Sequence, residues 1–456
     1  MRIVAAIITA LLLASLALNY YLFGELNRRT STLSYLQRLN ATLAAEAEEL
    51  GPYRKSREEE RERKAVVEEI CRIRELSLKH PIRFSSMSRE KLQEYIEEEL
   101  EEQYPGDEME YLMRALVRFG FTDEKFDLKE TIVDLYTEQV GGLYDNEDDT
   151  LYLVEGSTAT KSMAATFLAH EVIHALQDQD LGLDGMPLKL KGNDDTVMAS
   201  IALIEGDATV AMFQFYLSRM DAGNLADLAS MMFTDSKEYS DAPDFIKENL
   251  LFPYVQGSAF VSALFADGGW KRVDGAYSRL PSSTEQILHP EKYLEGGDEP
   301  VPVRLPDLEV FGWKKLQENV LGEFNSLVLL KSRIPLEDAE TASRGWGGDR
   351  FGLYEQDGKE VLVWLSAWDT VAEAGEFHRS FRTFQGKARD AGGDTVPGGE
   401  DDLTWSTDKD TEICFLGRRG REILFISGSL GTDIPAIRSA FGDFKMEDFH
   451  EEDISG

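Results

Sequence analysis

The chain opens with a long apolar run. No charged residue occurs from Ile3 to Phe23, which is about the length that a helix needs to cross a bilayer roughly 30 Å thick. We expect residues 1–24 to be a transmembrane anchor, because the run ends in aromatic residues suited to the headgroup zone. A signal peptide, cut after the small residues Ser15 and Ala17, is the alternative. Basic residues flank both ends, so the expected extracytoplasmic location of the body depends on the shortness of the leading segment.

The next segment, residues 25–80, predicts a helical stalk. Its leucines recur at heptad spacing, with Asn40 at a position where a polar residue can set the register of a coiled coil: Leu36, Leu43 and Leu50. Gly51 and Pro52 interrupt the repeat. Two predictions therefore stay open for the stalk, namely a homodimer and packing onto the chain's own body.

Two regions with different patterns follow. Residues 81–304 have a mainly helical pattern, except that "EQVGGLYDNEDDTLYLVEG" places two short apolar runs around an Asn/Asp-rich turn, which predicts a β-hairpin. Residues 305–456 combine strand-like runs such as "EVLVWLSAWD" and "REILFISG" with an amphipathic helix. The expected fold class is α+β, with a helical domain over 81–304 and a C-terminal α+β domain over 305–456. In the latter, helices should lie on one face of a small antiparallel sheet, and its tryptophans should be core residues.

Composition narrows the classes of function. The chain has 456 residues, 42% of them hydrophobic, and is long enough for more than one domain with a core. Its formal net charge of -36 excludes a sequence-independent grip on nucleic acid, which needs clustered Lys and Arg. Nucleic acid is therefore not an expected partner. Only two cysteines, Cys71 and Cys414, are present, so no disulfide framework is expected.

The clearest chemical signal is "FLAHEVIHALQDQ", residues 167–179. His170 and His174 lie one helical turn apart, so both imidazoles project from one face and can share one cation. Glu171 lies about 100° further round the helix, where its carboxylate can take a proton from a metal-bound water. Apolar residues give the same helix a face to bury. The pattern predicts a zinc site with the chemistry of a zinc peptidase.

A catalytic zinc needs a third protein ligand beside an open position, and three residues compete for that role. Asp180 would be the ligand if the chain turned back at once, but Gln177 replaces the glycine that such a turn needs. His289 precedes a proline, where a histidine more often caps or packs. Glu205 interrupts the apolar helical run "TVMASIALIEGDATVAMFQFYL", where burying a carboxylate is costly unless a cation compensates. Glu205 is the ligand we expect.

With His170, Glu171 and His174 on one helix and Glu205 on a following helix, the sequence resembles the gluzincins, the thermolysin-like clan of zinc metallopeptidases. A narrower resemblance is to a largely uncharacterised family of membrane-anchored prokaryotic proteins predicted to be metallopeptidases. The blocks that carry it are "GGLYDNEDDTLYLV", "LAHEVIHALQDQ", "ALIEGDA", "FPYVQGSAF" and "STEQILHPEKY". The resemblance implies Zn²⁺ bound by His170, His174 and Glu205, with Glu171 as the general base and water as the nucleophile.

The resemblance also implies roles outside the metal ligands. Gluzincins stabilise the oxyanion with a downstream histidine or tyrosine, which makes His289 the expected catalytic residue here and Tyr293 the alternative. Their aspartate four residues beyond the ligand glutamate is replaced by Thr209, so Asp207 or Asp178 is expected to orient a zinc histidine. The hairpin strand would pair with an extended chain, which makes a peptide or protein the expected substrate.

The function expected from the sequence is a membrane-anchored, zinc-dependent endopeptidase that hydrolyses peptide bonds with a Glu-activated, zinc-bound water. A non-catalytic, zinc-stabilised binding or scaffold protein is the alternative. We expect zinc because it is the usual metal of such a motif. The residues alone do not select it, since N and O ligands accept several divalent ions. Glu171→Gln separates the two classes: the enzyme loses hydrolysis and keeps zinc, whereas the scaffold loses nothing measurable.

Overall fold

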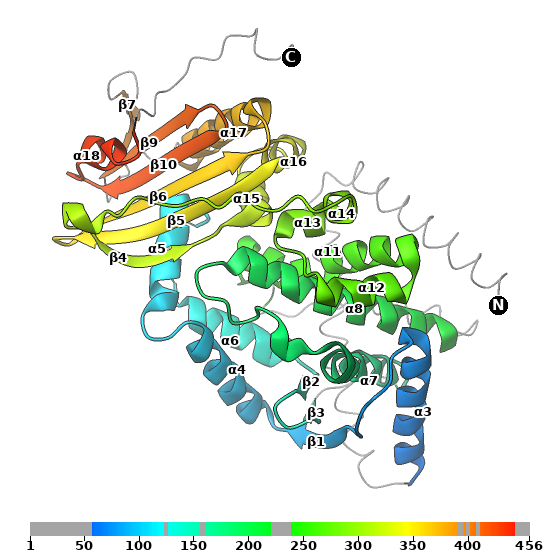
Figure 1. Ribbon diagram of the computed structural model, residues 1–456. Coiled ribbons are helices and arrows are strands. Elements are labelled where there is room, and N and C mark those ends of the chain that lie inside the picture. The colour runs from blue at the N-terminus through cyan, green and yellow to red at the C-terminus, as the bar shows by residue number, and fades with distance from the viewer. Residues whose placement is uncertain are drawn as a thin grey trace.

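The computed structural model describes residues 57–122, 126–155, 161–219, 239, 241–389, 395–397, 402–406 and 411–442. The predicted anchor and the first part of the predicted stalk lie outside these residues. Over the described residues the fold is α+β, as expected, with a mainly helical part and a part built on a large sheet (Figure 1).

The helical part contains the elements from α3 to α14. Local signals explain several boundaries: the Ser88 and Asp127 side chains accept backbone N–H groups at the starts of α4 and α6, and Gly120, with φ 96°, ends α5. A π-helical turn, η2 (Gln177–Leu181), and a 3-10 turn, η3 (Leu183–Gly185), follow α7. The helices are α3 (Arg57–Arg74), α4 (Arg89–Gln103), α5 (Glu108–Phe119), α6 (Leu128–Gln139), α7 (Lys161–Leu176), α8 (Asp194–Arg219), α11 (Asp244–Gly268), α12 (Trp270–Ser278), α13 (Thr284–Leu288) and α14 (Pro290–Leu294).

A small sheet lies beside α7. The predicted hairpin is confirmed as β2 (Gly142–Asp145) and β3 (Thr150–Val154), which pair antiparallel. A third strand, β1 (Arg83–Met87), pairs parallel to β3 and gives the order β1-β3-β2. The sequence pattern did not predict β1. Because β3 is central, β2 is an edge strand of this sheet.

The sheet part is larger than expected. Its sheet has seven strands in the order β4-β5-β6-β10-β9-β8-β7, with antiparallel neighbours. The strands are β4 (Lys314–Asn319), β5 (Trp346–Gln356), β6 (Lys359–Trp368), β7 (Thr395–Pro397), β8 (Asp402–Ser406), β9 (Thr411–Arg419) and β10 (Glu422–Ser429). The other elements are η4 (Glu309–Phe311), α15 (Gly322–Lys331), α16 (Leu336–Ser343), α17 (Val371–Arg389) and α18 (Ile434–Ser439).

Both faces of this sheet are buried, which explains its long apolar runs. Trp364 and Phe425 face the helices α15, α16 and α17, whereas Val363 and Leu424 face α18 on the opposite side. The expectation of helices on one face is therefore wrong for α18. The tryptophans of β5 and β6 are core residues, as predicted. Phe119 of α5 also packs on this sheet, with its ring centroid 5.4 Å from that of Trp364.

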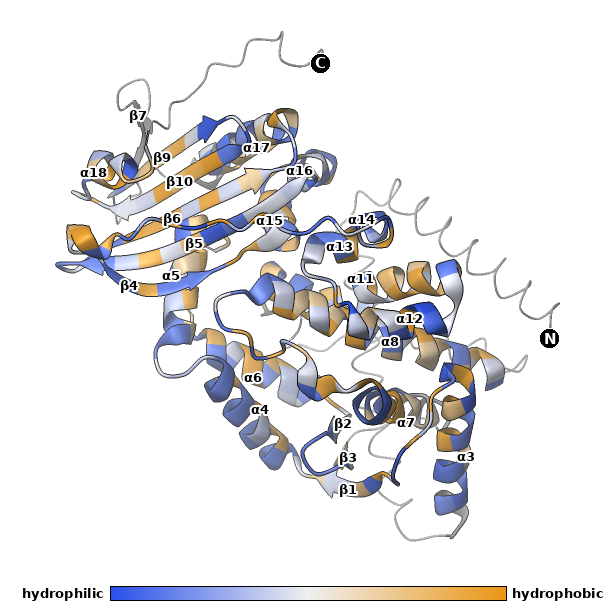
Figure 2. Ribbon diagram, viewed as in Figure 1, coloured by the Kyte–Doolittle hydropathy of each residue, from blue (hydrophilic) through white to orange (hydrophobic). Residues whose placement is uncertain are grey.

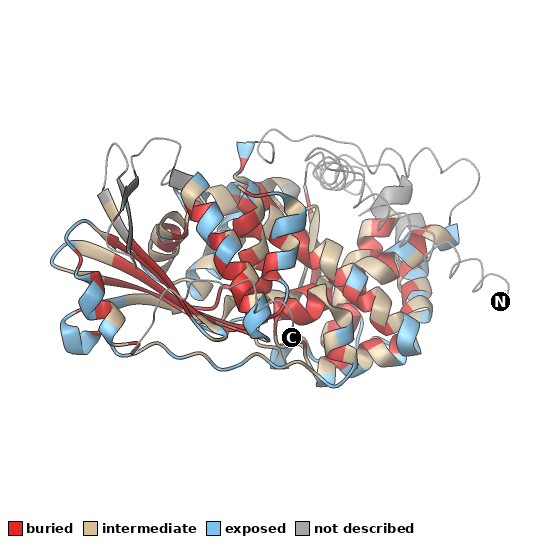
Figure 3. Cartoon of the chain, turned by 90° about the horizontal axis from the view of Figure 1, so that it is seen from above, coloured by how far each residue is buried: buried red, intermediate tan, exposed pale blue. Residues whose placement is uncertain are grey.

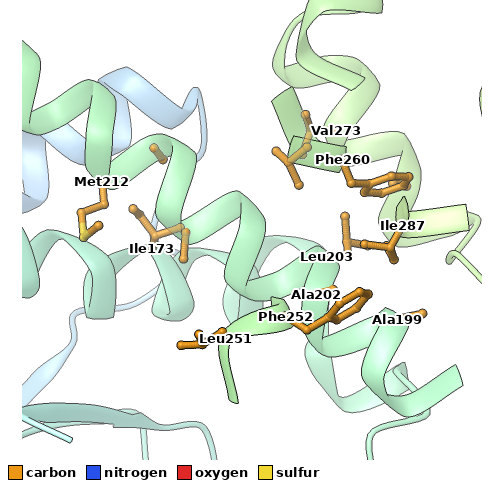
Figure 4. Close-up of a cluster of buried hydrophobic side chains, with 14 of the residues drawn as sticks. Ile173, Ala199, Ala202, Leu203, Met212, Leu251, Phe252, Phe260, Val273 and Ile287 are labelled. Carbon is orange, nitrogen blue, oxygen red and sulfur yellow. The ribbon is translucent and has the colours of Figure 1, made fainter. Parts of the chain in front are cut away.

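The core of the helical part lies where α7, α8 and α11 meet. Figure 4 shows its buried side chains converging from α7, α8, α11, α12 and α13. Helix α3 belongs to the predicted stalk and packs on α7 and α8, with Val66 and Ile70 buried. By length and composition, α8 and α11 are both apolar enough to cross a membrane. Figures 2 and 3 show apolar and buried residues gathered inside both parts of the molecule.

Candidate metal centre

The two histidines of the sequence motif lie on α7, which contacts β2 on one side and α8 on the other (Figure 1). Helical spacing directs both imidazoles to one side, while Val172, Ile173 and Leu176 are fully buried. That apolar packing fixes the rotation of α7 about its axis. The histidines consequently face α8 at the position of Glu205.

Three side-chain atoms converge there. His170 Nε2 lies 3.1 Å from Glu205 Oε2 and 3.0 Å from His174 Nε2, and His174 Nε2 lies 3.6 Å from the same oxygen. Ligands placed tetrahedrally about 2.0–2.1 Å from zinc stand about 3.3 Å from one another. The spacing and chemistry of these donors therefore fit zinc. We call His170, His174 and Glu205 the triad.

Within the triad, His174 and Glu205 shift each other's pKa. Burial acts to lower the pKa of His174, but the Glu205 carboxylate outweighs it and raises that pKa to about 9. Burial likewise acts to raise the pKa of Glu205, yet His174 and His170 hold it well below its usual range. The carboxylate is thus ionised, and a cation that binds here displaces a proton from His174.

Glu171 lies beside the triad and close to the small sheet. The backbone of Tyr144, in β2, is among the groups that act to lower its pKa. A Cβ atom on Gly142 would lie 3.5 Å from Glu171 Cγ, so β2 passes close to this side chain. Burial raises the pKa of Glu171, which moves it toward the range of a base that works near neutral pH.

A glutamine supports the second histidine. His174 Nδ1 lies 2.8 Å from Gln177 Oε1, and Gln177 Nε2 donates to Ile204 O at 2.9 Å and to Asp207 Oδ2 at 3.1 Å. Because an amide oxygen can only accept, His174 donates from Nδ1 and turns Nε2 toward the triad. The glutamine that replaces a turn glycine in the sequence pattern has this role instead.

Asp207 is the centre of a buried ionic cluster. Arg74, from α3, donates to both of its carboxylate oxygens, at 2.7 and 3.0 Å. Tyr277 donates to Asp207 Oδ2 at 2.8 Å, and Asp274 pairs with Arg74 at 2.6 Å. Arg74 and Asp207 are both 0% exposed. A charged pair this deep depends on the hydrogen bonds between its two members, and within the described residues Nη1 of Arg74 is left without a partner.

A close helix contact brings a tyrosine to the site. A Cβ atom on Gly206 would lie 2.2 Å from the backbone of Gly257, so α8 and α11 approach at a point where only glycine fits. Tyr254, one turn before Gly257, lies with its ring centroid 6.3 Å from that of His170. Burial first, and then the charge of Glu205, raises the pKa of Tyr254 well above its ordinary value. Its hydroxyl therefore stays protonated and can donate.

Other residues singled out in the sequence lie elsewhere. Asp180 pairs with Lys79 at 3.8 Å, and Asp178 accepts from Tyr144 at 2.9 Å. His289 Nε2 lies 2.9 Å from Glu323 Oε1 of α15, and Tyr293 donates to the backbone of Arg279 at 2.6 Å. None of these contacts is with the triad, and the catalytic role of His289 stays a prediction.

Sequence reasoning gave no role to Tyr254 or Arg74. "FPYVQGSAF" was noted only as a block of the resemblance, although its Tyr-x-x-Gly spacing places the tyrosine one helical turn from the helix contact. Arg74 is one of many arginines near the end of a charged helix, and nothing local distinguishes it.

A second group of carboxylates meets between the two parts. Glu285, Asp298 and Asp369 offer oxygens within 4.8 Å of one another. Lys292 Nζ lies 2.6 Å from Glu285 and 2.7 Å from each of the other two. The ammonium group of this lysine is therefore the cation that the group holds.

Comparison with known proteins gives a match to a family model and a match to a solved structure. A family model described as a domain of unknown function (DUF8575) matches residues 309–438, which do not include the triad. A crystal structure described as that of "a putative hydrolase with a novel fold" from Chloroflexus aurantiacus is similar over 57% of this chain and 97% of that chain. Its sequence identity is 16% and its TM-score 0.36. No curated protein matches.

Proposed function

We propose that this chain is a zinc-dependent peptidase in which His170, His174 and Glu205 hold Zn²⁺. One observation carries the proposal: two imidazole nitrogens and a carboxylate oxygen converge at 3.0–3.6 Å, with the carboxylate of Glu171 beside them. Zn²⁺ bound to such a set supplies Lewis acidity that makes a coordinated water acidic near neutral pH.

Glu171 acts as the general base in this proposal. Its carboxylate accepts the proton of the attacking water and later delivers a proton to the leaving amine. Its raised pKa brings proton transfer closer to balance near neutral pH. The pKa of Tyr254 is raised by burial and by the charges of Glu205 and Glu171. Its protonated hydroxyl donates to the oxygen on which negative charge develops.

The substrate we propose is an extended peptide. Strand β2 is an edge strand directly beside Glu171, and an edge strand offers backbone groups with which a peptide can pair. Tyr136 of α6 is 41% exposed, and the charge of Glu205 is among the causes that raise its pKa. The resemblance to the gluzincins, the membrane anchor at residues 1–24, the extracytoplasmic body and a homodimer through the stalk remain parts of the proposal.

Metal content is the test of the binding site. Full-length protein in detergent should carry about one zinc per chain, and Glu205→Ala should lose most of it. Asp180→Ala, which removes an exposed acid on the turn after α7, is the matched control and should keep its zinc. If Glu205→Ala retains zinc while Asp180→Ala loses it, the triad is wrong and Asp180 is the third ligand.

Hydrolysis of a quenched-fluorescence peptide library is the test of catalysis. Glu171→Gln should bind zinc like wild type and cleave about 10²- to 10⁴-fold more slowly, because it lacks a general base. Equal zinc content with no difference in cleavage would favour the non-catalytic scaffold.

A further inference from the structure

We infer that Gln177 is a positioning residue for the metal ligand His174, and that Arg74 of α3 holds Gln177 in place through Asp207. The inference rests on the proposed function and extends it, because it assigns the binding geometry of one ligand to a relay that ends on another helix. We call Gln177, Asp207 and Arg74 the relay.

The first step is the orientation of the amide. Gln177 is 0% exposed, and its Nε2 faces two acceptors, Ile204 O and Asp207 Oδ2. A flipped amide would place its oxygen against both of these acceptors and its NH₂ group against His174, so one orientation is fixed. That orientation presents only an acceptor to His174 Nδ1, which must then carry the proton. Nε2 is the nitrogen left for the metal.

The second step is the position of Asp207. Its two oxygens receive Arg74 Nε and the Tyr277 hydroxyl as well as Gln177 Nε2. Arg74 is fixed in turn, because its guanidinium lies 4.4 Å from the centre of the Trp270 ring. If the carboxylate moved away from Gln177, the buried Arg74 would lose both of its hydrogen bonds to Asp207.

The third step concerns the position at which gluzincins carry the aspartate that orients a zinc histidine. Thr209 stands there, and its hydroxyl is buried with no hydrogen-bond partner in the described part of the chain. It does not orient a histidine. A neutral amide, backed by a carboxylate one step further away, takes over this task. Because Arg74 ends α3, a helix of the predicted stalk is linked to the metal site.

The experiment compares two buried glutamines of the same turn. Gln177→Met removes the relay, and Gln179→Met is its control, because Gln179 accepts from the backbone at 79–80 instead of contacting the triad. Zinc affinity is measured by competition with a chromophoric chelator on full-length protein in detergent. We expect Gln177→Met to bind zinc about 10- to 100-fold more weakly, and Gln179→Met to bind like wild type even if it melts earlier.

A spectroscopic readout separates positioning from general loss of structure. In zinc-loaded protein labelled with ¹⁵N-histidine, His174 should show a metal-bound Nε2 and a slowly exchanging Nδ1–H. That proton should exchange rapidly in Gln177→Met and slowly in Gln179→Met. A metal-bound Nδ1 in wild type overturns the inference without any variant, so the test stands even if Gln177→Met fails to fold.

The link to α3 has its own variant. Arg74→Met with Asp207→Asn removes both charges, so neither is left buried alone, and the remaining carbonyl can still accept from Gln177. We expect zinc affinity to fall by about tenfold or less. Unchanged affinity overturns the Arg74 link, and unchanged affinity in Gln177→Met overturns the relay. Absence of zinc from wild type is a different result, because it overturns the proposed function itself.

Discussion

The helical part and the sheet part differ in what lies at the centre of each. The helical part encloses an ionic cluster around Arg74 and Asp207 at its centre. The sheet part fills its interior with stacked and edge-on aromatic rings, among them Trp364, Trp368 and Phe377. One part uses its core to place charged groups near the triad, and the other uses its core for stability.

Two buried aspartates show what this difference means. Asp349, in the sheet part, accepts from the backbone N–H groups of Leu321 and Gly322 and from two indole N–H groups, at 2.8–2.9 Å. All four donors are neutral. Asp207 depends on Arg74, which is 133 residues distant in the chain. The donors to Asp349 come from its own sheet and from the turn beside it. The arginine that donates to Asp207 comes from a helix at the far end of the described chain.

The largest effect on stability is expected in the sheet part. Trp364→Ala removes a fully buried ring and one donor to Asp349, and it should lower the free energy of unfolding by about 3–5 kcal/mol. Urea unfolding followed by near-ultraviolet circular dichroism measures this. The folded fraction should keep its zinc, because no triad atom is touched. Loss of zinc in folded Trp364→Ala would show that the two parts are not separable in this way.

A change in packing in the helical part should weaken zinc binding as well as stability. Gly206→Ala places a methyl group 2.2 Å from the backbone of Gly257, and such overpacking should cost about 1–3 kcal/mol or more. Because α8 must shift, Glu205 moves with it and zinc affinity should fall.

Gly275→Ala is the matched control. A Cβ atom there meets nothing within 4 Å, and alanine within a helix should stabilise by about 0.5–1 kcal/mol. The thermal midpoints and zinc contents of the Gly206→Ala and Gly275→Ala variants test this expectation. Equal behaviour of the two would contradict the close contact of α8 with α11.

The smallest effect is expected from pH at the junction of the parts. Asp195, at the start of α8, accepts from Thr284, and burial raises its pKa to about 7, compared with about 3.9 in an unfolded chain. The folded state therefore binds more protons between these values, and this group makes stability fall as pH rises toward 7.

Asp195→Asn should remove that dependence. From about pH 5 to about pH 8 the variant should gain about 1 kcal/mol or more relative to wild type, since each pKa unit is worth about 1.4 kcal/mol. Urea midpoints at the two pH values measure the difference. Parallel pH profiles would show that Asp195 does not titrate during folding.

Whether a feature could be predicted from the sequence depends on how far apart in the chain its interacting residues lie. The hairpin and the α7 motif depend on residues close together in the chain, and the structure has β2, β3 and α7 where the patterns indicated them. Strand β1 was missed because it pairs in parallel with β3, more than sixty residues away, and such pairing leaves no local signal. The stretch "GWGGDRFGLY" was not predicted to be a strand, but most of it forms β5, with an irregular register between Trp346 and Gly348.

The candidate site divides in the same way. Both histidines and Glu171 follow from helical spacing, and Glu205 from the cost of a carboxylate in an apolar helix. Gln177 had been considered only as a residue that prevents a turn. Its hydrogen bonds to His174 and Asp207 join two helices, and no pattern within one helix contains that information.

Three consecutive residues of α8 serve three neighbours: Glu205 faces the histidines, Gly206 touches α11, and Asp207 binds Arg74 of α3. Successive residues of a helix point about 100° apart, so one tripeptide serves all three directions only at a single rotation of α8. Asp195 fixes that rotation from the start of the helix through its hydrogen bonds to Thr284. We therefore expect the chain between Asp195 and Glu205 to tolerate no change of length: insertion or deletion of one residue there would turn the tripeptide away from all three neighbours at once.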